Sequence, residues 1–291
     1  MNDFFLFMDT CDVLNYADDN TIVFSSKTLN IMKSTIENAS LQAINWFRHI
    51  IMQANPNKFQ ALYLSKHTDK DLHFNIAEHV LHPESSVKLL GIHFDKDLNF
   101  QQHTTLICKK AAKQVNALIR LSHVLNSSSK KKIFNTFILS NFNYCPVVYT
   151  SFTKQNMSLM EKVQERALRF VVNDFSSPYS NILQTMGVPS ITMSMIRKVA
   201  EQVFKVHHGM SPPLPPLFFQ SAQTSYDLRC KHNFILPKFH TVKYGKQSFE
   251  YMGAFIWNSL PINIKSSTTY TEFKTKLKNW NGPNYNCKYC I

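Results

Sequence analysis

The chain has 291 residues, 44% hydrophobic and 18% charged, which is the composition of a globular protein and excludes a disordered one. Its net charge of +13 is unevenly distributed along the chain. Residues 1–60 hold 4 basic and 6 acidic groups, whereas the remainder holds 28 basic and 13 acidic groups, a balance of +15. Such a basic body favours a polyanionic partner, most often nucleic acid, although a soluble basic protein without that partner fits the charge equally well.

The first hundred residues are predicted to mix short strands with one helix. Residues 11–26 form two runs of strand-forming residues around Ala-Asp-Asp-Asn, which indicates a β-hairpin. Apolar residues then recur at helical spacing over 29–51: Ile31, Ile36, Leu41, Ile44, Phe47 and Ile51. A strand is expected at 59–64, and a strand pair at 87–100, broken near Gly91. This mixture indicates an α+β region.

From residue 104 onward the apolar spacing is mostly helical. The pattern predicts helices over 104–125, 127–142 with a serine cap, 156–172 and 191–209, the last closed by Gly209. The Pro-rich residues 211–218 indicate a stiff linker, because proline is excluded from helix interiors and inner strands. Beyond the linker, 233–245 looks extended, 246–261 and 269–280 look helical, and Thr269 with Glu272 forms a capping box.

The sequence gives no sign of secretion or of a membrane span. No segment reaches the roughly 18 consecutive apolar residues that a membrane helix needs. The apolar opening Met-Asn-Asp-Phe-Phe-Leu-Phe-Met-Asp is short and lacks a basic start, so it is not a signal peptide. Four of the six cysteines are scattered singly, as is typical of reduced thiols. We therefore expect an intracellular protein of the nucleus, the cytoplasm or both, not a secreted one.

Cys287 and Cys290 form a single Cys-x-x-Cys pair close to the C-terminus. A structural zinc site normally needs four ligands, so this pair is half of one, and zinc binding stays open.

Asp18 and Asp19 are adjacent carboxylates in the predicted hairpin turn. A tight hairpin would hold them at an exposed apex, where a hard cation such as Mg²⁺ binds carboxylates together with water and phosphate oxygens. An ordinary Asp-Asp-Asn turn with solvated side chains explains the same four residues.

Tyr-Ala-Asp-Asp at 16–19 resembles the catalytic hairpin of reverse transcriptases, and the segments that follow are similar to that family in their order. These are a helix, Asn-Pro-Asn-Lys at 55–58, a Leu-Gly strand pair and a series of basic helices. Residues 254–280 also resemble the C-terminal region of non-LTR (LINE-type, CR1- or Jockey-like) retrotransposon polyproteins. The resemblance implies a partial palm at 1–103, a helical thumb at 104–175, a helical C-terminal region at 176–280 and a tail at 281–291.

The resemblance assigns roles to individual residues. Asp18 would be the principal metal ligand and Asp19 a lesser one, and Lys58 a possible acid near the leaving pyrophosphate. The vicinity of the primer and the nucleotide would include Tyr16, Ala17, Asn55, Leu89, Leu90 and Gly91. Helical spacing separately places two sets of basic residues on single faces, which are candidates for the nucleic-acid backbone or plain solvated exteriors: Lys109, Lys113 and Arg120, and Lys162, Arg166 and Arg169.

The activity implied is RNA-directed DNA synthesis with Mg²⁺, an RNA template and a DNA primer or target. The family places another catalytic aspartate and the fingers well upstream, whereas only 15 residues precede Tyr16 here. Asp3, Asp9 and Asp12 are the upstream candidates, and none reproduces a separate central strand. We therefore expect a truncated polymerase that is inactive alone and has a complementing upstream half. The alternatives are a nucleic-acid-binding module without chemistry, or a decayed element copy that exposes its apolar opening.

Overall fold

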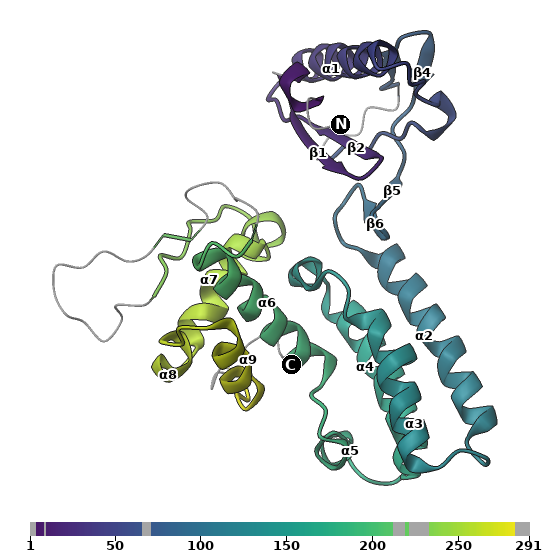
Figure 1. Cartoon of the computed structure of the whole chain (residues 1–291), viewed down its shortest axis with the longest axis vertical. Helices are drawn as coiled ribbons and strands as arrows, with labels where there is room; N and C mark the ends of the chain where they lie inside the picture. The colour runs from purple at the N-terminus through teal and green to yellow at the C-terminus, as the bar shows by residue number, and fades with distance from the viewer. Residues whose placement is uncertain (1–3, 9, 66–70, 212–218, 221–232, 283–291) are drawn as a thin grey trace, which may run out of the picture. The chain divides into compact units, whose positions relative to one another are not determined.

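A computed structural model of the chain describes residues 4–8, 10–65, 71–211, 219–220 and 233–282. The chain divides into two compact units, Met1–Leu98 and Asn99–Ile291 (Figure 1). Within the described residues all strands belong to the first unit and the second is helical, so the chain is α+β. The finer division into palm, thumb, C-terminal region and tail stays a prediction.

The described part of the first unit consists of antiparallel hairpins, one long helix and two short 3-10 turns. Its elements are η1 (Phe4–Phe7), β1 (Asp12–Tyr16), β2 (Asp19–Val23), α1 (Leu29–His49), η2 (Pro56–Lys58), β3 (Phe74–Ile76), β4 (His79–Leu81), β5 (Ser86–Leu89) and β6 (Ile92–Asp95). The strands pair as antiparallel hairpins, β1 with β2, β3 with β4 and β5 with β6. The predicted first hairpin, the long helix and the strand pair around Gly91 are confirmed.

Helix α1 packs against two groups of elements in this unit. Ala39, Ala43 and Trp46 pack against η1 and the β1–β2 hairpin, while residues on another face of α1 pack against β3. Phe4 is fully buried and meets the Trp46 ring edge-to-face, with 4.9 Å between centroids. Met8 is also buried, so the expectation that the apolar opening is left exposed is wrong for these two residues, because they complete the core beside α1.

The strand predicted at 59–64 is not formed. Only Leu62 makes an isolated parallel bridge, to Glu84. The apolar residues Phe59, Ala61 and Tyr63 instead pack against the core of β3 and β4 from an irregular backbone. The apolar residues of 59–64 therefore pack against this core without forming a regular strand.

The second unit is built of helices. Its elements are α2 (Gln101–Leu121), α3 (Ser127–Ile133), η3 (Phe134–Ile138), η4 (Leu139–Phe142), η5 (Pro146–Ser151), α4 (Lys154–Val172), α5 (Tyr179–Met186), α6 (Ile191–His207), η6 (Val242–Lys246), α7 (Phe249–Ser259), α8 (Ile262–Lys265) and α9 (Tyr270–Lys278). Helix α2 lies along α4, and α6 packs against α7 and α9 (Figure 1). Each group has its own core, one around Leu118 and Leu168 and one around Phe204, Trp257 and Phe273. Among the residues that the structure describes, none of the helices has both the length and the hydropathy of a membrane span.

Caps explain where several of these helices begin and end. The Gly209 N–H bonds to the carbonyl of Val206 and the Met210 N–H to that of Lys205, with Gly209 in the left-handed region at φ 66°, as a Schellman motif requires. Two predicted caps differ in detail. Asn126, not a serine, caps α3. The Glu272 carboxylate bonds to the N–H of Thr268 and not of Thr269, although Thr269 caps α9 as predicted.

Candidate nucleic-acid interface and acidic hairpin

The acidic pair lies at the exposed end of the first hairpin. Tyr16 pairs with Asp19 across the strands, and Ala17 and Asp18 form the two-residue loop between them. Ala17 has φ 55°, the left-handed conformation that such tight loops require. All four side chains are exposed, so the strands hold the two carboxylates in place and leave them open to solvent.

These carboxylates fit part of the coordination of one hard divalent ion, which takes one or two carboxylates with water and phosphate oxygens. Asp12 lies on the same strand as Tyr16 but four residues away, about 13 Å along it, which is too far to share an ion with Asp19. In the described part of the chain, no group of three or more His, Cys, Asp or Glu side chains could hold a metal ion.

Asn55 and Lys58 lie together in the short turn η2. The Asn55 side chain accepts a hydrogen bond from the Asn57 N–H at 3.1 Å, and Pro56 occupies the first position of the turn. Both Asn55 and Lys58 are exposed. No hydrogen bond or ion pair between described residues joins Lys58 to Asp18 or Asp19.

Leu89, Leu90 and Gly91 lie at the tip of the β5–β6 hairpin. Leu89 pairs with Ile92, and both loop residues have positive φ, 46° at Leu90 and 86° at Gly91, as in a type I′ turn. The segment after η2 is tied to the start of this hairpin, because the Glu84 N–H donates to the Ala61 carbonyl at 2.8 Å. This hydrogen bond joins the segment that follows Asn55 and Lys58 to the segment that leads to Leu89, Leu90 and Gly91. The acidic hairpin instead packs against α1.

The basic residues predicted on α2 share one exposed face. Lys109, Lys113 and Arg120 are exposed, and the buried positions Ala111, Val115 and Leu118 lie on the opposite side. Asn116 occupies the same face between Lys113 and Arg120, because residues three and four apart are neighbours on a helix.

On α4, Lys162 and Arg166 are exposed as well. The Arg166 Nη2 donates to the Asn116 Oδ1 at 2.9 Å, so the basic face of α4 joins that of α2. We define the α2–α4 surface by its five cations, Lys109, Lys113, Arg120, Lys162 and Arg166. Helical spacing predicted each face, but it could not predict that they meet.

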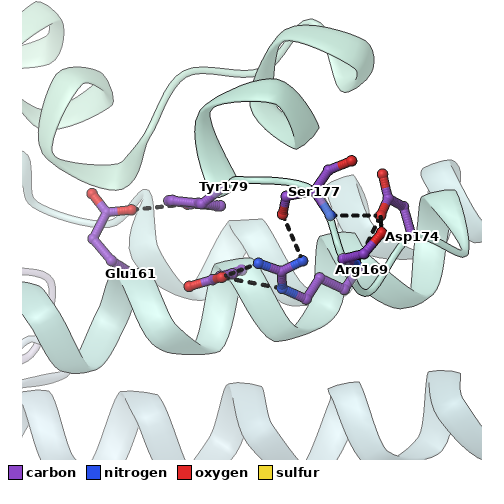
Figure 2. A network of polar contacts seen from close by, with 7 residues as sticks. Glu161, Arg169, Asp174, Ser177 and Tyr179 are labelled. Carbon is purple, nitrogen blue, oxygen red and sulfur yellow. Dashed lines mark hydrogen bonds and ion pairs between the residues drawn. The ribbon is translucent and has the colours of Figure 1, made fainter.

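Arg169, the sixth predicted cation, is held within the protein (Figure 2). Its guanidinium donates twice to Glu165 Oε1, at 2.6 and 3.1 Å, and once to the Ser177 carbonyl at 3.0 Å. The Ser176 and Ser177 N–H groups donate to Asp174, and hydrogen bonding from these serines lowers the pKa of Asp174 to about 2. Arg169 therefore fixes the chain that leaves α4, and its contact with a phosphate stays a prediction.

A surface cavity of about 230 Å³ adjoins the α2–α4 surface. Its lining combines charged and aromatic side chains: Lys162, Glu165, Arg166, Arg169, Phe170 and Phe175. The Phe170 and Phe175 rings pack edge-to-face with centroids 4.9 Å apart. Sequence reasoning missed Asn116 and Phe175; extending the α2 face from Lys113 by three residues would have found Asn116, but no local signal marks Phe175.

Glu161 connects three helices of the second unit (Figure 2). It accepts a hydrogen bond from the Tyr179 hydroxyl at 2.9 Å and two more from the N–H and hydroxyl of Thr192. Burial, and then the negative charge of Glu161, raise the pKa of Tyr179 well above its usual range. This network positions α5 and the start of α6 against α4.

The cysteines in the described residues offer no reactive site. Burial raises the pKa of Cys108 to about 11, which disfavours its thiolate, and it also raises the pKa of Cys11 and Cys145. Cys287 and Cys290 lie outside the described residues.

The chain is similar to the probable RNA-directed DNA polymerase from transposon BS of Drosophila melanogaster, with 24% identity over 166 residues. The match covers 54% of this chain and 18% of that relative, so the chain spans about a fifth of the relative's length. No family model and no solved structure matches the chain. The similarity supports a relationship to the RNA-directed DNA polymerases of transposons.

Proposed function

We propose that this chain is part of a non-LTR retrotransposon reverse transcriptase of the LINE type, CR1- or Jockey-like, and that it holds the duplex of RNA template and DNA primer. The observation that carries the proposal is the Arg166–Asn116 hydrogen bond, which makes the basic faces of α2 and α4 one surface. The similarity to a transposon polymerase supports a nucleic acid as the partner.

The size of the α2–α4 surface suits a duplex. Lys109 and Arg120 are 11 residues apart, about 16 Å along the helix axis. A duplex carries one negative charge per about 1.7 Å of its axis, hence roughly ten over that length, of which about half face one side. Five cations therefore match the phosphates that such a duplex would present.

The acidic hairpin would hold Mg²⁺ through Asp18 and Asp19. When bound, the ion supplies charge neutralisation to the phosphates of the nucleotide. Tyr16 would lie beside the primer terminus because it is paired with Asp19, and Lys58 would give a proton to the leaving group. Two-metal chemistry needs carboxylates from more than one strand, so we propose that an upstream segment supplies the third and that this chain alone does not polymerise.

Primer extension on a primed RNA template, with Mg²⁺ and deoxynucleotides, tests the proposal alongside a binding titration with the same duplex. The expected result is salt-sensitive binding without extension. Extension that Asp18→Ala abolishes, and that the distant Asp12→Ala leaves intact, would overturn the dependence on an upstream carboxylate. Absence of duplex binding would overturn the proposed function.

A nucleic-acid-binding module without chemistry is the second candidate, because the α2–α4 surface needs no metal ion to attract phosphates. The two candidates differ in their response to Mg²⁺. Mg²⁺ also competes for the phosphates, so the parent is compared with Asp18→Asn in each condition. If Asp18 and Asp19 hold the ion against the primer end, the difference in duplex affinity between the two proteins should be larger in Mg²⁺ than in a chelator. An equal difference in both conditions would favour the module.

A further inference from the structure

A second exposed surface of the Asn99–Ile291 unit is formed by residues 233–247. This segment contains three lysines, one histidine and no acidic residue. Its exposed side chains interleave cations with rings and include Lys238, Phe239, His240, Lys243 and Tyr244. Proteins that hold single-stranded nucleic acid use this combination, because the cations attract phosphates while unpaired bases stack on the rings.

The start of the segment is anchored to the helices behind it. Phe234 is buried, its N–H donates to the Asn258 side chain at 2.8 Å, and its carbonyl accepts from the same side chain at 2.9 Å. Lys265 donates to the Asn233 side chain at 2.7 Å and to the Asn258 carbonyl at 3.0 Å. Asn233 and Phe234 are therefore held in place against α7 and α8.

The end of the segment is fixed as well. It forms the π-helical turn η6 and then enters α7, which Ser248 caps. Phe239 packs so closely on Gly245 that a Cβ at Gly245 would lie 2.6 Å from the Phe239 Cβ. The Phe239 ring also meets Tyr251 edge-to-face at 5.0 Å, which holds the ring in one orientation.

Both rings keep a large open area despite these contacts. Phe239 is 41% exposed and Tyr244 is 48% exposed. The Lys243 Nζ lies over one face of the Tyr244 ring, 5.1 Å from its centroid, so a base would stack on the other face and have a cation near its phosphate.

We propose that residues 233–247 bind single-stranded nucleic acid, with Phe239 and Tyr244 stacking on unpaired bases and Lys238 and Lys243 contacting phosphates. The charge selects a polyanion, and the two open rings select unpaired bases over a duplex, whose bases are already stacked. This inference goes beyond the proposed function, because it concerns another segment and another form of nucleic acid, and it does not involve the acidic hairpin.

The test uses the full chain with Lys109→Gln, Lys113→Gln and Arg120→Gln as background, which weakens the α2–α4 surface. Fluorescence anisotropy follows the binding of labelled RNA and DNA 12-mers. Tyr244→Ala should weaken binding about five- to tenfold, the low end for loss of one stacked base. Phe239→Leu, which keeps an apolar group against Gly245, should do likewise, and Lys243→Gln should reduce the salt slope by about 0.7. A larger loss with one 12-mer supports the proposal and identifies RNA or DNA as the strand.

Phe137→Ala is the matched control, because it removes a ring that is 55% exposed on η3, outside the segment. It should leave 12-mer binding unchanged, and polyphosphate, which has charge but no bases, should bind Tyr244→Ala as well as the parent. Unchanged 12-mer affinity in both Tyr244→Ala and Phe239→Leu would overturn the proposal, and so would an equal loss of polyphosphate binding. Duplex binding by the chain without the background changes is measured separately, so failure of the proposed function is distinguishable.

Discussion

Replacing Lys109, Lys113 and Arg120 by glutamine removes three of the five cations of the α2–α4 surface. All three side chains are exposed, and glutamine has nearly the same helix propensity as lysine and arginine, so α2 should keep its structure. The buried residues of α2 lie on its opposite side and are unchanged. Any effect on binding therefore reports lost charge.

The size of the effect follows from counterion release. Each contact with a duplex phosphate contributes about 0.9 to the slope of log affinity against log salt. Five contacts give a slope of about −4.5 and a loss of roughly 500-fold in affinity between 50 and 200 mM salt. The triple variant should have a slope of about −1.8 and lose only about 12-fold over the same range.

Anisotropy titrations of a labelled RNA–DNA hybrid at four or five salt concentrations measure both slopes. Lys278→Gln is the matched control, because Lys278 is also an exposed lysine in a helix but lies on α9, outside the α2–α4 surface. Its slope should stay close to that of the unaltered chain. The reasoning is refuted if the triple variant keeps the original slope, or if Lys278→Gln alone lowers the slope as much as the triple variant does.

Three further predictions concern stability. Leu90→Asn, which creates the Asn-Gly loop favoured by a type I′ turn, should raise the free energy of unfolding of the first unit by about 1 kcal/mol in a urea titration, whereas a loss would contradict the assigned turn. Phe273→Ala should lower that of the second unit by about 3–5 kcal/mol, because this fully buried ring stacks on Phe204, and a loss under 1 kcal/mol would contradict its place in the core. The pKa of Asp174 is lowered from 3.8 to about 2, so its stabilising effect is complete above pH 4 and is lost as the pH falls through about 2. Urea titrations should therefore find Asp174→Asn less stable than the parent at pH 7, with a difference that shrinks between pH 4 and pH 2; a difference that does not depend on pH would disprove the assigned hydrogen bonds.

Helices α2, α4 and α6 and the basic faces of α2 and α4 were predictable, because both follow from periodicity within one helix. Helix α5 was not predicted, the helix expected over 127–142 is an α-helix only to Ile133, and the segment expected to be extended over 233–245 ends in the turn η6. Ala111, Val115 and Leu118 repeat at helical spacing and are buried, and this places the lysines on the other side. The contact between Arg166 and Asn116 was not predictable, since it joins residues 50 apart. Its formation depends on how each helix is rotated against the other, which periodicity leaves open.

In the first unit, apolar spacing gave the helix but not its buried face. Ile31 and Leu41 are exposed, while Ala39 and Ala43 are buried because their small side chains let the neighbouring elements approach closely. Ile51 lies beyond the end of α1 and is 96% exposed. The β1–β2 and β5–β6 hairpins were predictable from the sequence around their loops, whereas the β3–β4 hairpin was not predicted and pairing of the 59–64 segment depends on a distant partner at Glu84.

Photo-cross-linking of the full chain to an RNA–DNA hybrid, followed by identification of the cross-linked peptides, is the most direct test of the α2–α4 surface as the duplex site. The account predicts cross-links within residues 101–121 and 154–172, from both helices and reduced by high salt. Cross-links confined to other peptides, with neither helix labelled, would contradict it.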